Sequence, residues 1–198
     1  MLKNHAMIPG KLVCVLCVVV FPVLLFGLSQ DSPGYSLREA QKVLGFIEKI
    51  QQAQLESGNR KLRNIVVTES ELNSYIAHRI KVEQEEILRE LRLKLFENNR
   101  VEWKIVLDLK DANLPKILKP RMTFYMGGKL EVEEGNVRLN LEDLFLENQR
   151  IQVSVFELVI FIGSRLMGSE PFSMSDWWEL PYGIKDIQTQ QGKATFFY

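Results

Sequence analysis

Cysteine and histidine are scarce in this sequence, and their scarcity excludes several kinds of chemistry. The two cysteines, Cys14 and Cys17, lie inside an apolar run near the amino terminus, and the two histidines are His5 and His78. The chain after the run therefore has no cysteine for a disulfide. A histidine-based metal cluster, a Ser/His/Asp triad or a Cys/His pair has too few members. We expect a protein that is not an enzyme and that uses no metal or other cofactor.

Neither sign of charge is in excess. The chain carries 25 lysines and arginines and 25 aspartates and glutamates, a formal net charge of zero. Binding to nucleic acid through its phosphates needs a strongly basic surface. We therefore expect no nucleic-acid partner. Residues 30–198 are numerous enough for one domain with one sizeable core.

An uncharged apolar run extends from Leu12 to Leu28, after Lys3 and Lys11 and before Asp31, the first charge beyond it. As a helix the run would be about 25 Å long, slightly short of a hydrocarbon core of about 30 Å. Lysines before such a run hold that end in the cytoplasm. The run therefore predicts a membrane segment, with the rest of the chain outside the cytoplasm.

Two fates of this run are open. Gly27 and Ser29 have the small-x-small spacing of a signal-peptidase site, which favours cleavage and a secreted or periplasmic product. Against cleavage, the run is longer than most signal cores of about 7–15 residues. If the run is retained, the protein crosses the cytoplasmic membrane once. The membrane-spanning residues would then include Leu12, Val18, Leu24 and Leu28.

Two helices are predicted from capping boxes. Ser36 and Glu39 precede a helical repeat of apolar residues, which predicts a helix over 37–56. Thr68 and Glu71 introduce a second, shorter helix, whose apolar face includes Leu72, Tyr75, Ile76 and Ile80.

The rest of the chain alternates between apolar and polar residues, as strands of an antiparallel sheet with one wet face do. Hairpins are predicted from 91–95 to 101–109 around Asn98-Asn99, from 122–132 to 137–141 around residues 134–136, and from 184–188 to 194–198 around Gln191-Gly192. Gly127-Gly128 predicts a bulge or tight bend.

The apolar segment 151–167 is too short for a second membrane span. Its β-branched residues predict a strand from Ile151 to Val155, and its continuation predicts a buried helix from Phe156 to Met167. The resulting fold class is α+β, with an N-terminal membrane helix and then a curved antiparallel sheet of hairpins packed on two or three helices. The expected division is a signal-anchor or signal peptide over 1–29, a helical connector over 30–62 and an exported α+β domain over 63–198.

Two short motifs resemble a known group of proteins. The segment Val67–Tyr75 reads V-T-E-x-E-L-N-x-Y, and Leu180–Ile187 reads L-P-x-G-I-x-x-I. This pattern is similar to uncharacterised bacterial membrane-anchored proteins with half-tubular folds, related to the tubular lipid-binding superfamily. The resemblance implies a strongly curved sheet around a helix, an apolar groove and handling of lipids at the cell envelope. It transfers no catalytic residue.

Five aromatic residues are the candidates for contacts with a ligand or an interface: Trp103, Phe156, Phe161, Trp177 and Trp178. Trp177 and Trp178 are adjacent, so in extended chain their rings cannot both enter the same core, and one is expected to be partly exposed. Such a ring suits a membrane surface or a protein partner. The alternative is a loop that folds both rings over the edge of the sheet.

Other polar features predict no chemistry. His78 falls off the apolar face of the short helix, which favours a solvated or capping histidine over a catalytic one. The carboxylates Glu83, Glu85, Glu86 and Glu90 could be read as acid/base groups or calcium ligands, but basic neighbours favour an ordinary charged surface.

Two functions are therefore open. In the first, a non-enzymatic domain tethered to the membrane binds lipid or another amphiphile in an apolar groove. In the second, the core is filled and the domain serves as a structural or interaction module in an assembly of envelope proteins. An apolar channel that opens to solvent favours the first, and a tightly packed sheet favours the second.

Overall fold

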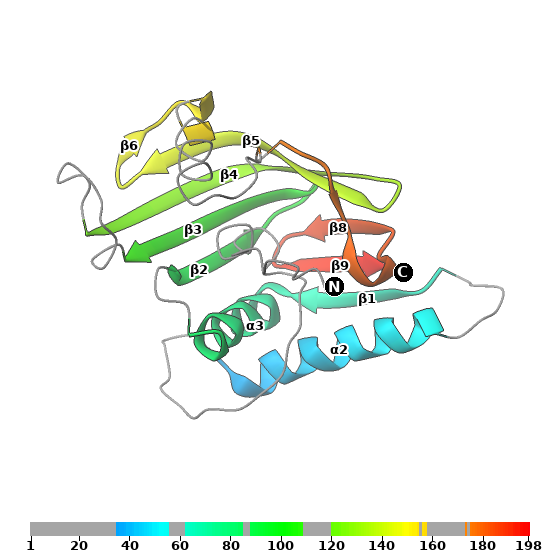
Figure 1. Ribbon diagram of the computed structural model, residues 1–198. Coiled ribbons are helices and arrows are strands. Elements are labelled where there is room, and N and C mark those ends of the chain that lie inside the picture. Colours follow the sequence, from blue (N-terminus) through cyan, green and yellow to red (C-terminus); the bar gives the residue numbers. More distant parts are fainter. Residues whose placement is uncertain are drawn as a thin grey trace, which may run out of the picture.

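The computed structural model describes residues 35–55, 62–84, 88–108, 120–154, 156–157, 173 and 175–198. The predicted membrane segment with Leu12, Val18, Leu24 and Leu28 lies outside these residues, as does Phe161. Within the described ranges, no helix is long and apolar enough to cross a membrane. The described part is an α+β structure with a curved antiparallel sheet, two α-helices and a second, smaller sheet (Figure 1).

Helices α2 (Leu37–Leu55) and α3 (Glu69–Val82) confirm the two helices predicted from the sequence. The capping box that begins α3 is complete. The Thr68 hydroxyl accepts a hydrogen bond from the N–H of Glu71 at 3.2 Å, and the Glu71 carboxylate accepts one from the N–H of Thr68 at 2.9 Å. These two bonds satisfy amide groups that the first turn of a helix cannot pair internally.

The capping box predicted for α2 forms only by half, so that prediction is corrected. Ser36 Oγ accepts a 3.4 Å bond from the N–H of Glu39, but the Glu39 carboxylate does not return to Ser36. It accepts hydrogen bonds from the hydroxyls of Ser70 and Ser74 on α3, each at 2.8 Å. The N–H of Ser36 donates instead to Ser74 Oγ. The neighbouring helix thus supplies the partners that a local box would have supplied.

A six-stranded antiparallel sheet forms the larger layer of the molecule. Its order follows the sequence, with β7 paired to the start of β5 at one edge. The Asn98-Asn99 turn between β2 and β3 has φ of 58° and 61°, as the predicted tight hairpin requires. The strands are β2 (Leu88–Leu95), β3 (Arg100–Asp108), β4 (Arg121–Glu133), β5 (Asn136–Leu146), β6 (Gln149–Arg150) and β7 (Trp178–Glu179).

The bulge predicted at Gly127-Gly128 is confirmed. Gly128 pairs with Leu141 and Gly127 pairs with Asp143, so Glu142 is an extra residue on β5. A Cβ atom on Gly128 would lie 2.4 Å from the carbonyl oxygen of Asn140, which explains the glycine at this position. Bulges of this kind bend the strand and increase its twist, and here they help to curve the sheet.

The last hairpin does not join the curved sheet, contrary to the sequence-based expectation. Strands β8 (Asp186–Gln190) and β9 (Lys193–Phe197) pair with β1 (Asn64–Thr68) in a separate three-stranded sheet of order β1-β9-β8. The two sheets meet where the N–H of Gly192 donates to the carbonyl of Leu95 at 3.0 Å. No local signal in 64–68 identifies a partner so distant in the sequence.

The core lies between the curved sheet and a second layer made of α3, α2 and the three-stranded sheet (Figure 1). Each fully buried leucine or isoleucine here, such as Leu139, Leu144 and Ile76, contributes about 1.5–3 kcal/mol through removal from water. The buried residues form one large cluster and a smaller one of Ile50, Leu180, Ile184 and Ile187 beside the 3₁₀ turn η1 (Pro181–Gly183). The length predicts one core, and the described residues form one main cluster with a smaller cluster in addition.

The strand predicted from Ile151 to Val155 is wrong. The chain turns at Glu147, where φ is 55°, and β6 ends at Arg150. Ile151 still bonds through its N–H to the carbonyl of Leu144, but Val153 and Ser154 are already helical. A short apolar, β-branched run suits a buried helix as well as a strand, and periodicity does not separate the two. Of the helix predicted from Phe156 to Met167, the described residues Phe156 and Glu157 are helical, and the rest lies outside the described ranges.

Side chains of α3 cover the free edge of β2. The Asn73 side chain accepts a bond from the N–H of Leu93 at 2.7 Å and donates one to the carbonyl of Leu93 at 2.8 Å. The Glu69 carboxylate accepts a bond from the N–H of Leu95 at 2.8 Å. An uncovered edge strand offers these same groups to other chains. Helix α3 thus closes this part of the edge.

Candidate functional site

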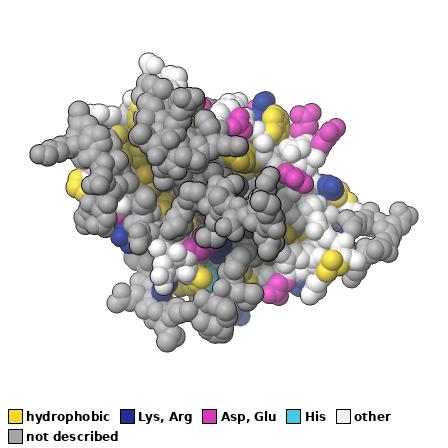
Figure 2. Space-filling model, viewed as in Figure 1, with side chains coloured by type: hydrophobic (Ala, Val, Ile, Leu, Met, Phe, Trp, Pro, Cys, Tyr) yellow, Lys and Arg dark blue, Asp and Glu magenta, His cyan; other side chains and the backbone are white. Residues whose placement is uncertain are grey.

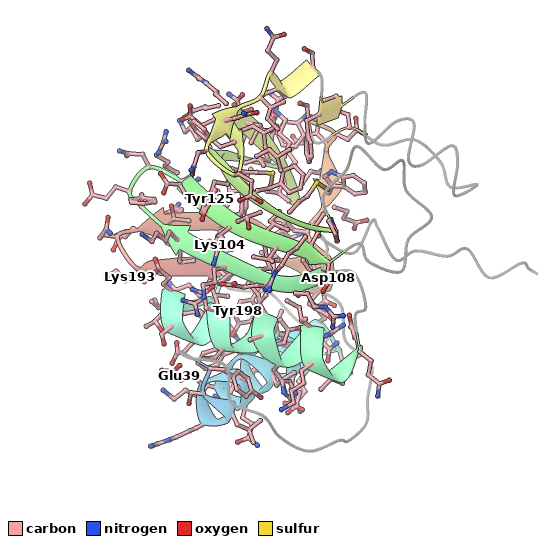
Figure 3. The ribbon with its side chains drawn as sticks, turned by 90° about the vertical axis from the view of Figure 1, so that its left-hand side faces the viewer. Glu39, Lys104, Asp108, Tyr125, Lys193 and Tyr198 are labelled. Carbon is pink, nitrogen blue, oxygen red and sulfur yellow. The ribbon has the colours of Figure 1, made fainter. Side chains whose placement is uncertain are left out.

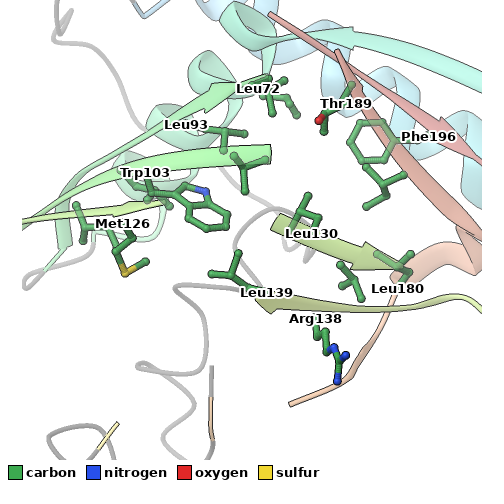
Figure 4. A pocket seen from close by; sticks show the side chains of 17 residues that line it. Leu72, Leu93, Trp103, Met126, Leu130, Arg138, Leu139, Leu180, Thr189 and Phe196 are labelled. Carbon is green, nitrogen blue, oxygen red and sulfur yellow. The ribbon is translucent and has the colours of Figure 1, made fainter. Parts of the chain in front are cut away.

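An apolar cavity of about 120 Å³ lies between the two layers of the fold (Figure 4). One wall is the inner face of the curved sheet, with Trp103 on β3, Met126 and Leu130 on β4 and Leu139 on β5. The opposite wall comes from the second layer. It includes Leu72 of α3, Leu180, and Ile187, Thr189, Ala194 and Phe196 of the last hairpin.

The alternation of the strands explains why this cavity is apolar. In β2 the buried residues Leu91, Leu93 and Leu95 share one face, and exposed Arg92 and Lys94 share the other. The same period of two places Leu130 and Leu139 opposite each other across the β4–β5 pair. Every wall strand therefore turns an aliphatic or aromatic face to the cavity.

The polar residues beside the cavity offer it no free group. Thr189 Oγ1 donates to the carbonyl of Phe96 at 2.6 Å, and the N–H of Thr189 donates to the Asn99 side chain at 2.8 Å. The Arg138 side chain points away from the apolar residues (Figure 4). It bonds to the Glu131 carboxylate at 2.6 Å and lies over the Trp177 ring, 4.6 Å from its centroid. The cavity wall thus selects for an apolar group.

The volume limits what the cavity holds in this structure. An engineered protein cavity of about 150 Å³ stays dry and takes benzene or xenon, whereas sites for drug-sized ligands have volumes of about 300–1,000 Å³. At about 120 Å³, the cavity accepts a benzene-sized group or a few carbons of an acyl chain. It does not enclose a complete lipid.

The structure brings one of the five predicted contact residues to the cavity. Trp103 lines it, whereas Phe156 packs on the main core with its ring 5.6 Å from that of Phe124. Trp177 is 40 % exposed, which confirms that one of the adjacent rings faces outward, and Trp178 is half-buried in β7. Phe161 lies outside the described residues.

Sequence reasoning missed the aliphatic residues that make up most of the wall. Alternation in β4 and β5 identifies Met126, Leu130 and Leu139 as inward-facing, but it does not say which layer they meet. Phe196 reaches the opposite wall because β9 pairs with β1, and neither local pattern nor spacing predicts that pairing.

His78 on α3 is half-buried and lies beside Tyr35, the first described residue. The Tyr35 hydroxyl and His78 Nδ1 are 3.0 Å apart, and the two rings are stacked with centroids 6.3 Å apart. Burial, with the charges of Arg79 and Lys81, lowers the pKa of His78. His78 is therefore neither fully solvated nor a helix cap.

The carboxylates that lie close together in the sequence from Glu83 to Glu90, interpreted there as an ordinary charged surface, do not converge in the part of the chain that the structure describes. Glu83 pairs with buried Arg79, while Glu90 pairs with Lys104 at 3.1 Å and Arg92 at 2.9 Å. Glu85 and Glu86 lie outside the described residues. Among those described, no three His, Cys, Asp or Glu side chains gather as metal ligands would.

Acidic and basic side chains are interspersed on the face of the molecule shown in Figure 2. Among the described residues, the apolar cavity is the candidate site for a ligand. Comparison with known proteins adds no assignment: no family model matches the chain, and no curated protein matches it.

Proposed function

We propose that this protein is a non-enzymatic, membrane-tethered domain that holds an apolar part of a lipid or another amphiphile between its two layers. The observation that carries the proposal is the apolar cavity, with Trp103 and Leu130 on one wall and Phe196 on the other. The apolar run from Leu12 to Leu28 supports the tether. The resemblance of Val67–Tyr75 and Leu180–Ile187 to bacterial lipid-binding-like proteins supports the ligand class.

The cavity volume sets how the ligand would enter. Because about 120 Å³ takes only a few carbons of a chain, the rest of the amphiphile remains outside the cavity or the two layers move apart. The layers are joined at their meeting point by bonds such as that from Gly192 to Leu95. Separation of the layers away from that point would enlarge the cavity and keep the sheets intact.

A second candidate function rests on a different observation. Trp177 is 40 % exposed and is held in place by the Arg138 guanidinium, which itself bonds to Glu131. Exposed tryptophan and arginine are the residues most enriched in the centres of protein interfaces. In this alternative the core takes no ligand, and the domain acts as an interaction module of an envelope assembly through the surface beside β7.

Photolabelling separates the two functions. The full chain in its native membrane is irradiated with a diazirine-bearing fatty acid, and labelled peptides are mapped by mass spectrometry. If the cavity binds acyl chains, peptides of β3, β4 and β9 that line it carry the label. Ala194→Leu, which fills the cavity from β9, should remove that label. Label on the apolar run 12–28 should not change and serves as the internal reference.

Thr195→Leu is the matched control. Thr195 follows Ala194 on β9, so its side chain lies on the other face of that strand, and it pairs with half-exposed Val66 of β1. The substitution should leave the label in the cavity unchanged. If the cavity peptides are unlabelled in the natural chain, the ligand proposal is wrong and the interaction module is favoured. If Ala194→Leu lowers the melting temperature strongly, the added side chain overpacks a filled core, which also favours the second function.

A further inference from the structure

A charged groove runs along the outer edge of the curved sheet, where β2 approaches α3, and is separate from the apolar cavity. Tyr35, the first described residue, is among the residues that line it. Helix α3 and strands β2, β3 and β4 supply the other walls. Five cationic side chains line the groove: Lys81, Arg89, Arg92, Lys104 and Arg121.

Cationic charge is locally in excess here, although the whole chain is neutral. Against the five cations, the described lining contains two carboxylates, Glu69 and Glu90. Glu69 accepts the N–H of Leu95, and Glu90 pairs with Lys104 and Arg92. Arg121 is exposed and makes no ion pair with any described residue. Figure 3 shows Lys104 and Asp108 on β3 above α3.

A second bulge directs one of these cations outward. Leu88 pairs with Leu107 and Glu90 with Val106, so Arg89 is an extra residue on β2. Its side chain is 49 % exposed and lies 3.7 Å from Asp108. Bulges at sheet edges often redirect a side chain toward a functional surface. This one removes Arg89 from the regular alternation at the edge of the sheet that faces the groove.

The length of the chain before Tyr35 limits where a membrane can be. Only Ser29–Gly34 separate the apolar run from Tyr35, a link that spans at most about 25 Å when fully extended. If the run is in the bilayer, the end of the domain that carries Tyr35 is held near the bilayer surface. Cations attract anionic lipids only within about a Debye length, 8–10 Å at ordinary salt. The described residue that the tether holds closest, Tyr35, is one of those that line the groove.

We infer that this groove docks on the anionic lipid headgroups of the membrane in which the chain is anchored, through Arg89, Arg121 and their cationic neighbours. The inference rests on the membrane tether of the proposed function and is independent of the apolar cavity. Phosphate oxygens match guanidinium groups in geometry as well as charge. Docking would fix the orientation of the domain and place α3 and the β2 edge against the bilayer.

Arginine footprinting on the full chain tests this inference. The protein is reconstituted in vesicles of phosphatidylcholine, or of phosphatidylcholine mixed with phosphatidylglycerol, and treated with phenylglyoxal. On the anionic vesicles, Arg89 and Arg121 should react at least about five-fold more slowly than on neutral vesicles, because each docked cation is worth about 1 kcal/mol. Arg150, which is 68 % exposed on β6, should react equally on both and is the internal control. High salt should remove the protection.

A charge-reversal pair separates docking from other effects. In Arg89→Glu/Arg121→Glu, Arg92 remains in the groove and reports on docking. Arg92 should be protected from phenylglyoxal on anionic vesicles in the natural chain, and it should lose this protection in the variant. Lys129→Glu/Lys193→Glu makes the same change of charge at exposed positions outside the groove and should keep the protection. Melting curves of both variants verify that each is folded.

The outcomes distinguish this inference from the function on which it rests. If the chain does not float with either kind of vesicle, the tether is wrong and both proposals fail. If it floats but Arg89 and Arg121 react equally on neutral and anionic vesicles, the groove does not bind headgroups, and the tether and cavity are unaffected. Protection that survives Arg89→Glu/Arg121→Glu would also overturn the inference, because the contact would not depend on these charges.

Discussion

Two residues with the same predicted role, Ser36 and Thr68, differ in what they do. Thr68 shares a complete capping box with Glu71, whereas Ser36 keeps only one long bond to the N–H of Glu39. Burial alone would raise the pKa of the Glu71 carboxyl. The hydrogen bonds from the Thr68 N–H, Lys42 and the Thr68 hydroxyl outweigh burial and hold that pKa below its ordinary value. The charged form of Glu71 is thus part of the cap.

The first prediction compares the two caps. Thr68→Ala removes an acceptor from the first turn of α3 and should lower the free energy of unfolding by about 1 kcal/mol, a typical loss for an N-cap. Ser36→Ala should cost less, because its bond is long and α3 supplies Glu39 with other partners. Denaturant unfolding of both variants measures this. Equal losses would show that the completeness of the box does not matter.

The second prediction concerns His78, whose pKa in the folded protein lies below the ordinary histidine value of 6.5 because of burial and the nearby charges of Arg79 and Lys81. As the pH falls, the unfolded chain therefore binds this proton first. The contribution to stability is complete above about pH 6.5 and decreases as the pH falls below that value. Lys81→Gln removes one positive charge and should raise the pKa of His78, and Lys193→Gln, at an exposed position on β9, should not.

The pKa of His78 can be measured from the imidazole C–H signals in NMR spectra recorded across a pH titration. A His78→Asn variant assigns the signal and separates it from that of His5. An unchanged pKa in Lys81→Gln would mean that the charge of Lys81 does not contribute to the lowered pKa of His78.

At the scale of elements, the curved sheet depends on a pair of glycines with unequal roles. A Cβ on Gly128 would lie 2.4 Å from a backbone oxygen, that of Asn140, whereas a Cβ on Gly127 would have neighbours at 3.6–3.7 Å. The first contact cannot be relieved by a side-chain rotation, because the obstructing atom belongs to the paired strand. The second is ordinary van der Waals contact.

The third prediction follows from this difference. Gly128→Ala should lower the free energy of unfolding by about 1–3 kcal/mol, as overpacking does. Gly127→Ala, one residue away in the same bulge, should change it by no more than about 0.5 kcal/mol. Thermal or denaturant unfolding of the two variants is the measurement. A large loss in both would indicate that the bulge needs glycine for its backbone conformation and not for space.

Sequence patterns predicted elements well where the signal is local. Alternation in 91–95 and 101–109 gave β2 and β3, and Thr68 with Glu71 marked the start of α3. They failed at Ile151–Val155, where an apolar run fits either a strand or a buried helix. They also could not reveal the pairing of β1 with β9. Since Phe196 enters the cavity through that pairing, the wall opposite the curved sheet depended on information that no local pattern contains.

At the scale of the whole molecule, the two candidate sites lie on different parts of one framework. The cavity lies between the layers, and the cationic groove follows the outer edge of β2, with Leu91 of that strand lining both. Helix α3 also contributes to both, through Leu72 to the cavity and Lys81 to the groove. A domain docked by its groove would therefore hold its cavity at a fixed orientation to the bilayer.

The pairing of β1 with β9 also bears on the order in which this chain can fold. All of the curved sheet lies between these two strands in the sequence, and Arg63 and Tyr198 bond to each other through both of their backbone groups, each at 2.9 Å. During synthesis β1 emerges early, but its partner follows only after every other strand has been made. Contacts between such distant segments form slowly. A ribosome-bound or translocating chain would therefore carry β1 unpaired until residues 193–197 are released.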